Sequence, residues 1–273
     1  MWQYSNYSKI NPEVQKHFPF KNPRADQLET ISEIVNAIDK GFKYIILEAG
    51  TGTGKSAIAY TLSSMYDSSY ILTVTKQLQD QYVDDFNNLK LVKGRSNFRC
   101  QQDSTLSCDE GKCLLEEFSC DNTKSTCDYH YQKTAALNSK KVISNYFYMF
   151  LELNYVGDFT KRELLICDEA HNLEDTLMSQ LTLEFSIDDL KNYLNFDITD
   201  ELLYQLDNGD YDVWIQFILE ICDNYQKEYD KIKFIDRPHL IEKKSFIKKE
   251  INDCRRLVEN ISHDPYSWIF DYN

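Results

Sequence analysis

The segment Ala49-Gly50-Thr51-Gly52-Thr53-Gly54-Lys55-Ser56 constrains this chain more than any other stretch. It follows an apolar run at 44–47 and precedes another apolar stretch at 57–62, which predicts a strand, a loop and a helix in that order. This is the context of a phosphate-binding P-loop, in which backbone N–H groups at a helix N-terminus surround a triphosphate. Ala49 departs from the usual pattern, which has glycine at that position.

The residue types of this segment predict an ATP site. Lys55 would reach the β- and γ-phosphates, and the Ser56 hydroxyl would ligate Mg²⁺. The predicted ATP-binding residues of the loop are Ala49, Gly50, Thr51, Gly52, Thr53, Gly54, Lys55 and Ser56. A glycine-rich turn before an ordinary helix is the alternative.

Apolar periodicity predicts an α/β fold for the first two thirds of the chain. Helices are expected at about 24–39, from 75 onward, at 129–138 and at 146–153, and strands at 44–47, 70–75, 141–145 and 164–167. Strands that alternate with helices are typical of a parallel sheet with crossover helices. Beyond 171 the pattern is helical, near 186–195, 210–230 and 240–261, and we expect a boundary near residue 180.

A second polar motif, Asp168-Glu169-Ala170-His171, follows the apolar run 164–167 directly. Ligands of parallel sheets bind at the carboxyl ends of the strands, so these side chains should lie beside the P-loop. We predict that Asp168 shares Mg²⁺ with Ser56, directly or through water, and that Glu169 polarises the attacking water as a general base. His171 could link the γ-phosphate to a nucleic-acid or interdomain contact. A helix start capped by Asp168 is the alternative.

Five of the eight cysteines fall within one irregular segment, at Cys100, Cys108, Cys113, Cys120 and Cys127. Four thiolates from such a segment suit an iron–sulfur cluster or a zinc ion. Cys108 and Cys113 form the tightest pair and are favoured as middle ligands, although Cys120 could replace either. The three isolated cysteines, Cys167, Cys222 and Cys254, are expected to be small core residues.

Charge and hydropathy limit the partners and the location that this chain can have. The formal net charge of −14 argues against attraction of nucleic acid by the whole surface, but not against a local basic groove. Residues 237–256 are rich in Lys and Arg, which fits such a groove or a solvated helix face. No apolar run approaches the ~18 residues of a membrane span, and no signal peptide is evident. We expect an intracellular protein, cytoplasmic or in the nucleus or nucleoid, without a membrane partner.

Taken together, these motifs resemble superfamily 2 helicases, and in particular the XPD/DinG branch. Phe18-Pro19-Phe20 with Arg24 and Gln27 resembles the adenine-side motif, and 73–78 resembles motif Ia, which touches single-stranded DNA. Segments 94–100, 127–129 and 143–146 resemble the boundaries of the iron–sulfur domain inserted between motifs Ia and II. Asp128 stands where that family usually has proline after the last cysteine.

The resemblance implies a P-loop RecA-like parallel sheet with an inserted cysteine-rich iron–sulfur domain and a C-terminal helical, arch-like domain. The implied boundaries are 1–93 and 129–180 for the RecA-like lobe, 94–128 for the cluster domain and 181–273 for the arch. It implies a 4Fe–4S cluster on Cys100, Cys108, Cys113 and Cys127, with Cys120 as the alternate ligand and zinc as the alternative metal. Arg24 and Gln27 would bind ATP, and DNA would contact Thr75, Lys76, Arg95, Asn145 and Tyr146, although core packing is the alternative for Tyr146.

The resemblance also implies that something is missing. No segment resembles helicase motifs III to VI, and in this family ATP lies between two RecA-like lobes, the second of which supplies arginine fingers. We therefore expect the N-terminal part of an ATP-dependent DNA helicase, with catalytic residues Lys55, Asp168, Glu169 and His171, that is weakly active alone. Its partners would be single-stranded or forked DNA and a second lobe. A regulatory module with an ATP switch and an iron–sulfur redox sensor are the competing interpretations.

Overall fold

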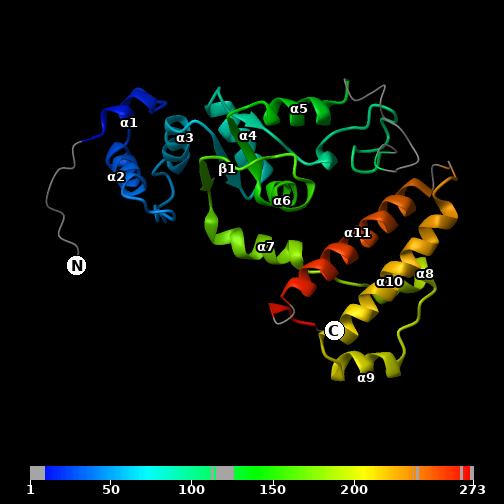
Figure 1. The fold of residues 1–273 in the computed structure, drawn as a ribbon. Coiled ribbons are helices and arrows are strands. Elements are labelled where there is room, and N and C mark those ends of the chain that lie inside the picture. Colours follow the sequence, from blue (N-terminus) through cyan, green and yellow to red (C-terminus); the bar gives the residue numbers. More distant parts are fainter. Residues whose placement is uncertain are drawn as a thin grey trace. The chain divides into compact units, whose positions relative to one another are not determined.

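The computed structural model describes residues 10–111, 114, 126–235, 237, 240–264 and 267–270 (Figure 1). The chain divides into two compact units. The first comprises Met1–Gly94 with Asp128–Leu177, and the second comprises Arg95–Cys127 with Met178–Asn273.

A four-stranded parallel sheet forms the centre of the first unit. Its strands are β1 (Ser69–Thr73), β2 (Lys90–Leu91), β3 (Lys141–Asn145) and β4 (Leu164–Cys167), in the order β2-β3-β1-β4. Its helices are α1 (Pro12–His17), α2 (Gln27–Asp39), α3 (Lys55–Met65), α4 (Lys76–Asp85), α5 (Asp128–Leu137) and α6 (Tyr146–Leu151), and a π-helical turn at Glu152–Val156 extends α6. The predicted α/β class with a parallel sheet is confirmed.

The register of the sheet brings the ends of three strands to one edge. In β1, Thr73 pairs with Asn145 of β3, and Leu72 pairs with Cys167 of β4. All five β1 residues are buried, as expected for a central strand. The chain leaves β4 at Asp168, whose backbone N–H still donates to Leu72 O at 2.8 Å. The carboxyl edge of the sheet therefore carries the segments that follow all three strands.

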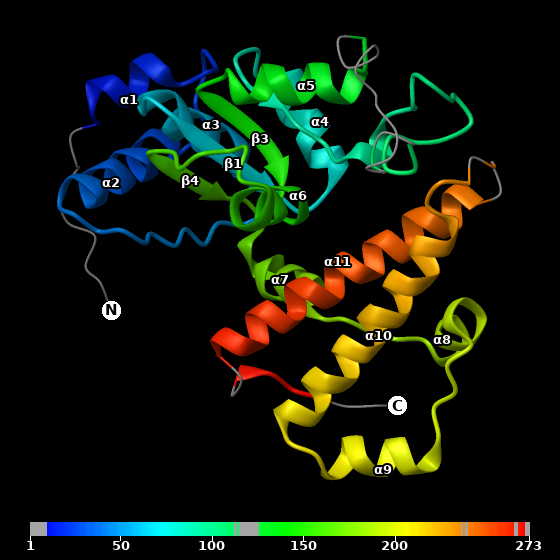
Figure 2. The ribbon, with the colours of Figure 1, turned by 45° about the vertical axis from the view of Figure 1, so that its right-hand side comes forward.

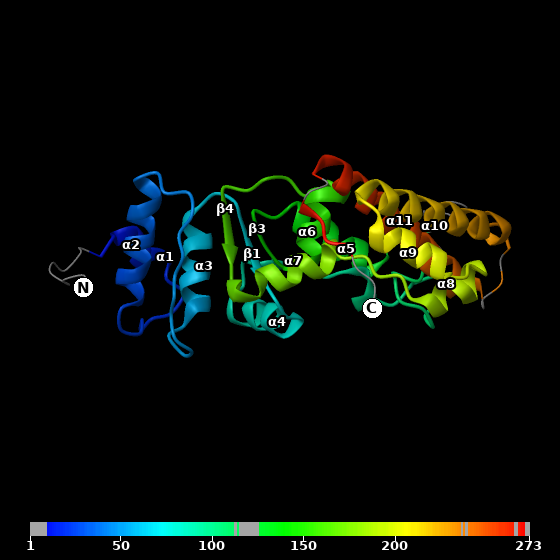
Figure 3. The same cartoon turned by 90° about the horizontal axis from the view of Figure 1, so that it is seen from below.

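Side chains of β1 alternate between two helical layers, as successive residues of a strand must. Ile71 packs with Ala59 of α3 and with Tyr82 and Phe86 from α4 and its end. Tyr70 points to the opposite face, where it meets Phe159, which in turn contacts Tyr148 of α6. Figure 3 shows α3 and α6 on opposite sides of the strands, with α1 and α2 beyond α3.

The strand predicted at 44–47 is wrong. These residues form no ladder, and the side chains of Tyr44 and Ile46 are 91% and 95% exposed. The apolar run has strand composition, but a strand needs a neighbour to satisfy its backbone, and none of the four described strands pairs with it. The periodicity also failed to predict α1, which begins at Pro12 behind the Asn11 cap, and the two-residue β2.

The second unit is helical apart from its cysteine-bearing segment. A short 3₁₀ turn at Arg95–Asn97 opens that segment, and the later helices are α8 (Ile187–Leu194), α9 (Asp200–Asn208), α10 (Tyr211–Ile232) and α11 (Ile241–His263). Another 3₁₀ turn at Ala170–Asn172 and α7 (Leu173–Leu181) connect β4 to this unit. The helical segments predicted at 186–195, 210–230 and 240–261 are confirmed.

Helices α10 and α11 form an antiparallel hairpin that carries the core of the second unit (Figure 2). Phe217, Ile221 and Tyr225 of α10 and Ile247 and Ile251 of α11 are all buried in it. Their spacing of three or four residues places them along one helical stripe. The hairpin therefore has the single apolar seam that its sequence periodicity indicates.

Two side chains of α11 bind the cysteine-bearing segment. Ser245 Oγ donates to Asp109 O at 3.3 Å, and Lys248 Nζ donates to Leu114 O at 2.8 Å. Part of the basic run at 237–256 is therefore engaged within the unit. Among the helices that the structure describes, none combines the length and apolar character needed to cross a bilayer.

Candidate nucleotide-binding site

The glycine-rich loop has the backbone geometry of its motif although the strand before it is absent. Gly52 and Gly54 lie at φ of +80° and +82°, in the left-handed region that favours glycine. Gly54 caps α3, and its carbonyl accepts from the N–H groups of Ala57 and Ile58 at 3.0 and 3.3 Å. Lys55 is thus the first residue of a helix whose N-terminus favours anionic groups.

Two residues that precede or begin α2 hold this loop. The Gln27 side chain is buried, and its Nε2 donates to the carbonyls of Thr53 and Gly54 at 2.9 and 3.2 Å. Arg24 donates from its backbone N–H to Gln27 Oε1 at 2.8 Å and from Nη1 to Gly52 O. A Cβ on Gly54 would lie 2.3 Å from Gln27 Nε2, so the loop and this amide need glycine between them.

The acidic motif follows β4 at the carboxyl edge of the sheet. Glu169 has φ of +55°, a left-handed conformation that costs a non-glycine residue about 1–3 kcal/mol. Its carbonyl accepts from Asn172 N–H at 3.0 Å in the 3₁₀ turn that follows. Such outliers are concentrated at functional sites, where the backbone is bent to aim a side chain.

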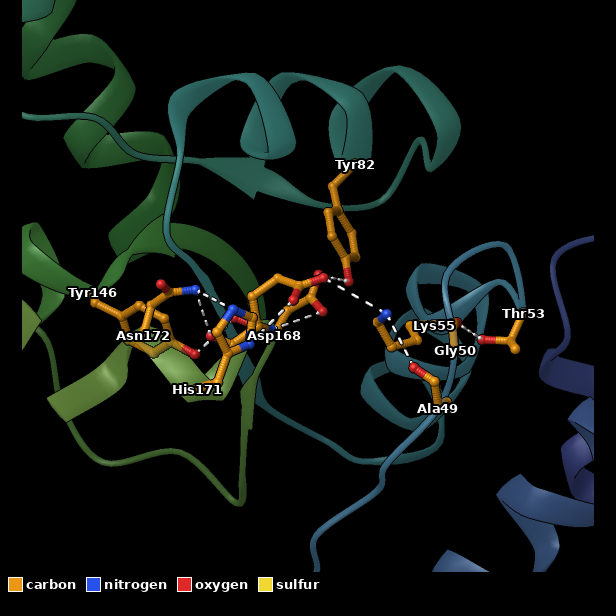
Figure 4. A network of polar contacts seen from close by, with 10 residues as sticks. Ala49, Gly50, Thr53, Lys55, Tyr82, Tyr146, Asp168, His171 and Asn172 are labelled. Atoms are coloured by element: carbon orange, nitrogen blue, oxygen red, sulfur yellow. Dashed lines mark hydrogen bonds and ion pairs between the residues drawn. The ribbon is translucent and has the colours of Figure 1, made fainter. Parts of the chain in front are cut away.

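A chain of ionic contacts joins the two motifs (Figure 4). Lys55 Nζ lies 3.7 Å from Glu169 Oε1 and donates to Ala49 O at 3.4 Å. His171 Nδ1 lies 3.4 Å from Glu169 Oε2, and His171 Nε2 lies 2.8 Å from the side-chain amide of Asn172. The structure therefore brings Lys55 together with Glu169 and His171, which lie more than a hundred residues further along the sequence.

Two buried tyrosine hydroxyls donate hydrogen bonds to Asp168. Tyr82 Oη donates to Asp168 Oδ2, and Tyr146 Oη donates to Asp168 O, both at 2.9 Å. Burial raises the pKa of both tyrosines well above the usual range; Asp168 adds to this effect for Tyr82, and Cys167 and Asp168 add to it for Tyr146. Both hydroxyls are therefore permanent donors. Sequence reasoning missed Tyr82, because no local pattern marks it.

Most of the predicted residues line one cavity of about 770 Å³ in the first unit, whereas Ala49, Gly50, Thr53 and His171 are not part of its lining. Its lining includes Phe20, Arg24 and Gln27 on one side, residues 51–52 and 54–57 of the loop, and Asp168 and Glu169 at the end of β4. A volume of this size is typical of small-molecule sites. The Ser56 hydroxyl and the Asp168 carboxylate are oxygen donors of the kind that Mg²⁺ takes, so this pair fits the predicted ion.

The residues predicted to contact DNA have different environments. Thr75 and Lys76 are exposed at the start of α4, where Thr75 Oγ1 accepts from Leu78 N–H at 3.2 Å. Asn145 caps α6 by accepting from Tyr148 N–H at 2.7 Å. Tyr146 is only 2% exposed, so its ring has the core environment that was the alternative to base stacking. Arg95 belongs to the second unit.

Three of the five clustered cysteines fall in the described residues, and all three are buried free thiols: Cys100, Cys108 and Cys127. The sulfur atoms of Cys108 and Cys127 lie 3.9 Å apart, and Cys108 Sγ lies 3.3 Å from Arg99 O. Cys113 and Cys120 lie outside the described residues. Within the part of the chain that is described, no three His, Cys, Asp or Glu side chains form a group that could hold a metal ion.

The isolated cysteines behave largely as expected for small apolar residues. Cys222 and Cys254 are buried in the core of the α10–α11 hairpin, and Cys167 is half-buried at the end of β4. Burial raises the pKa of Cys167, which keeps this thiol neutral beside the acidic motif.

Curated relatives of this chain are helicases. A probable ATP-dependent helicase of Methanocaldococcus jannaschii is 26% identical over 78% of this chain and 38% of its own length. An ATP-dependent DNA helicase of Haemophilus influenzae is 33% identical over 36% of this chain and 17% of its own length. The chain thus spans less than two fifths of either relative. No solved structure gives a significant match.

The family model that matches this chain is described as type III restriction enzyme, res subunit, and it covers residues 20–199. That range contains the loop at 49–56, the acidic motif at 168–171 and all four strands of the sheet. The glycine-rich loop, the acidic motif and the helicase relatives agree on a superfamily 2 helicase domain. This chain belongs to the family described as type III restriction enzyme, res subunit.

Proposed function

We propose that this chain is the ATP-binding part of a DNA helicase, in which ATP hydrolysis drives movement along single-stranded DNA and separation of the duplex. The observation that carries the proposal is the convergence of Lys55, Ser56, Asp168 and Glu169 on one cavity, with Lys55 and Glu169 already paired at 3.7 Å. A phosphate cradle, metal ligands and a base are the parts that nucleotide hydrolysis needs.

The P-loop would bind the triphosphate. Backbone N–H groups at the start of α3 face the phosphates, and Lys55 exchanges its contact with Glu169 for the β- and γ-phosphates. Ser56 and Asp168 would hold Mg²⁺, which neutralises the charge that develops on the phosphates. Arg24, just before α2, and Gln27, at its start, keep the loop in place, and exposed Phe20 offers a ring at the adenine side of the cavity.

Glu169 would act on the attacking water. Once Lys55 has turned to the phosphates, the Glu169 carboxylate is free to orient a water molecule and accept its proton. His171 lies 3.4 Å from Glu169. It would link the γ-phosphate to a nucleic-acid or interdomain contact. A second lobe would supply the arginine that stabilises the transition state.

That second RecA-like lobe is the partner we propose on structural grounds. Tyr44 and Ile46 are almost fully exposed, and Leu165 of the edge strand β4 is 54% exposed. Exposed apolar side chains at an unpaired sheet edge are typical of a surface that another segment covers. We propose that further sequence, in the same or a separate polypeptide, completes this sheet and brings the second lobe to the cavity.

We propose that single-stranded DNA crosses the first unit at the ends of β1 and β3. Thr75 and Lys76 at the start of α4 and Asn145 at the start of α6 offer a cation and polar groups to phosphates. Arg95 belongs to the second unit, and we propose it separately as a DNA contact of that unit. The chain has a formal charge of −14, so binding should depend on these local groups and weaken steeply with salt.

We also propose that the cysteine-bearing segment holds a metal group, a 4Fe–4S cluster by family resemblance or zinc. Three buried free thiols within one segment, two of them 3.9 Å apart, support a thiolate site. The edge of a tetrahedral zinc–thiolate site is about 3.8 Å for Zn–S bonds of 2.3 Å, so the spacing also fits zinc. Such a group would hold the segment against α11, without a step in hydrolysis.

The function is tested with the purified chain and a Lys55→Ala variant, by binding of a fluorescent ATP analogue and by hydrolysis with and without single-stranded DNA. We expect Mg²⁺-dependent binding that the variant loses, slow hydrolysis and no unwinding unless a second lobe is added. Robust unwinding by the chain alone would contradict the need for that lobe. An intact biological activity in a Glu169→Gln variant would favour the competing interpretation, a regulatory module in which the ATP site serves only as a switch.

The metal group is tested by iron, sulfide and zinc analysis of anaerobically purified protein with a visible spectrum. About four irons per chain and a broad band near ~400 nm would support the cluster. A content of one zinc per chain without iron would mean that the metal group is zinc and not a cluster. It would leave the proposed ATP site unaffected. Single Cys→Ser changes would then identify the ligands among Cys100, Cys108, Cys113, Cys120 and Cys127. Reversible oxidation that changes DNA affinity would favour a redox sensor.

A further inference from the structure

Tyr82 stands directly behind the predicted metal ligands without lining the cavity. It lies on α4 and is 1% exposed, and its hydroxyl donates to Asp168 Oδ2 at 2.9 Å (Figure 4). It is absent from the cavity wall, which Asp168 and Ser56 do line. Its hydroxyl can therefore act on an ion bound in the cavity through Asp168.

This contact connects two elements of the first unit. Tyr82 lies on α4 and Asp168 follows β4, so one buried hydroxyl fixes the Asp168 carboxylate from behind the cavity wall.

The Tyr82 ring is held rigidly enough for this task. It packs in the core with Ala59, Ile71 and Phe86, and its centroid lies 5.8 Å from that of Phe86. Phe86 in turn stacks on Tyr60 of α3 at 4.2 Å. A side chain confined in this way presents its hydroxyl at one place, which is how outer partners orient metal ligands.

We propose that Tyr82 is a positioning residue for Mg²⁺ binding, and this inference rests on the function proposed above. The phenol holds the Asp168 carboxylate in the orientation that the ion requires. An Asp168 side chain without this donor can rotate about two bonds and presents the needed orientation for less of the time. Outer partners of this kind typically change metal affinity by about 10- to 100-fold when they are removed.

Tyr82→Phe is the sharpest variant, because it removes one oxygen atom and keeps the ring in the core. Tyr70→Phe is its matched control. Tyr70 is 2% exposed in the same unit, and its hydroxyl donates to Thr160 O at 2.7 Å, away from the cavity. Both variants lose one hydrogen bond of a buried tyrosine, and only Tyr82→Phe loses the hydrogen bond to the predicted ligand Asp168.

The measurement is equilibrium binding of a fluorescent ATP analogue as a function of Mg²⁺ concentration, with EDTA as the metal-free reference. For Tyr82→Phe we expect the Mg²⁺ concentration at half-maximal enhancement to rise about tenfold or more, with unchanged affinity in EDTA. For Tyr70→Phe we expect the wild-type curve. A purely structural role for Tyr82 would instead lower affinity equally with and without the ion.

A double-mutant cycle keeps the test decisive even if Tyr82→Phe weakens the fold. In an Asp168→Asn background the Tyr82→Phe change should have no further effect on the Mg²⁺ dependence, because the Asp168 carboxylate through which Tyr82 acts is absent. Additive effects in this cycle, or a wild-type Mg²⁺ curve for Tyr82→Phe, would overturn the inference and leave the ATP site standing. Failure of the wild-type chain to bind nucleotide would overturn the proposed function and this inference with it.

Discussion

Lys55 Nζ lies 3.7 Å from Oε1 of Glu169, so the predicted phosphate-binding lysine and the predicted general base form an ion pair. Both side chains are about one third exposed, and water can therefore compete for either partner. We propose that a triphosphate replaces Glu169 as the partner of Lys55 and releases the carboxylate toward the cavity. Nucleotide binding and activation of the base would then be coupled through a single contact.

Glu169→Gln should separate these two roles. We expect hydrolysis to fall by about 10²- to 10⁴-fold, the usual contribution of a general base, because the amide cannot accept the proton of the water. Nucleotide affinity should stay equal or rise, since Lys55 no longer has a competing carboxylate. Single-turnover hydrolysis and equilibrium binding measure the two effects. Glu174→Gln, on the exposed face of α7, is the control, and equal losses in both variants would contradict the assignment.

Gln27→Ala should weaken ATP binding by releasing the loop from α2. The amide makes two hydrogen bonds to loop carbonyls, each with a net stabilisation of about 1 kcal/mol, and 1.4 kcal/mol corresponds to tenfold in affinity. We expect about a tenfold increase in the dissociation constant of the ATP analogue. Gln77→Ala, exposed on α4, should bind as the wild type does. Unchanged affinity in Gln27→Ala would mean that the loop is rigid without this amide.

Lys244→Met should destabilise the second unit. This lysine is 1% exposed, and its Nζ donates to the carbonyls of Lys233 and Ile235, at 2.8 and 2.9 Å, just after α10 ends. Removing the buried cation that donates to these two carbonyls should lower the free energy of unfolding by about 2–4 kcal/mol. Urea unfolding followed by circular dichroism measures it. Lys227→Met, exposed on α10, should change stability by less than about 0.5 kcal/mol.

The stability of the α10–α11 hairpin should fall as pH rises past the range of Glu250. Burial raises the pKa of this carboxyl above its usual 4.5, against the opposing effect of the adjacent Lys249 ammonium; Asp253 and Asp189 reinforce the rise. The folded state then holds a proton that the unfolded state has lost, so the contribution of Glu250 to stability is greatest below pH 4.5 and declines as the pH rises through the raised pKa.

Glu250→Gln tests this sign. The variant should be more stable than the wild type at pH 7, and the difference should vanish below pH 4.5, as measured by urea unfolding across a pH series. Glu242→Gln, exposed in the first turn of α11, is the control. A variant less stable than the wild type at pH 7 would mean that the Lys249 ion pair outweighs the cost of burial.

Sequence periodicity predicted the elements that carry their own apolar pattern. The faces of α2, α10 and α11 are visible in the spacing of residues such as Ile31, Val35 and Ile251. The run at 44–47 failed because strand formation depends on a partner, which the composition of the run cannot reveal. In the opposite direction, α1 was missed because it buries only Val14 and starts at a proline.

The site was predictable where a local motif specifies the chemistry and unpredictable where tertiary structure does. Lys55 and Glu169 belong to recognisable motifs, and parallel-sheet topology correctly implied that they meet. Tyr82 contacts Asp168 across 86 positions of sequence, through the packing of α4, and nothing near it in the chain indicates this contact. Tyr146 has the core environment that was the alternative to base stacking, and its local sequence could not decide between the two.

The most direct test of the central claim is Mg²⁺-dependent binding of an ATP analogue by the wild-type chain and by Lys55→Ala. We predict saturable binding by the wild-type chain that Mg²⁺ strengthens. In the variant the affinity should be at least tenfold lower, with both proteins equally folded by circular dichroism. Equal binding by the two proteins, or no binding by either, would contradict the assignment of this cavity as a nucleotide site.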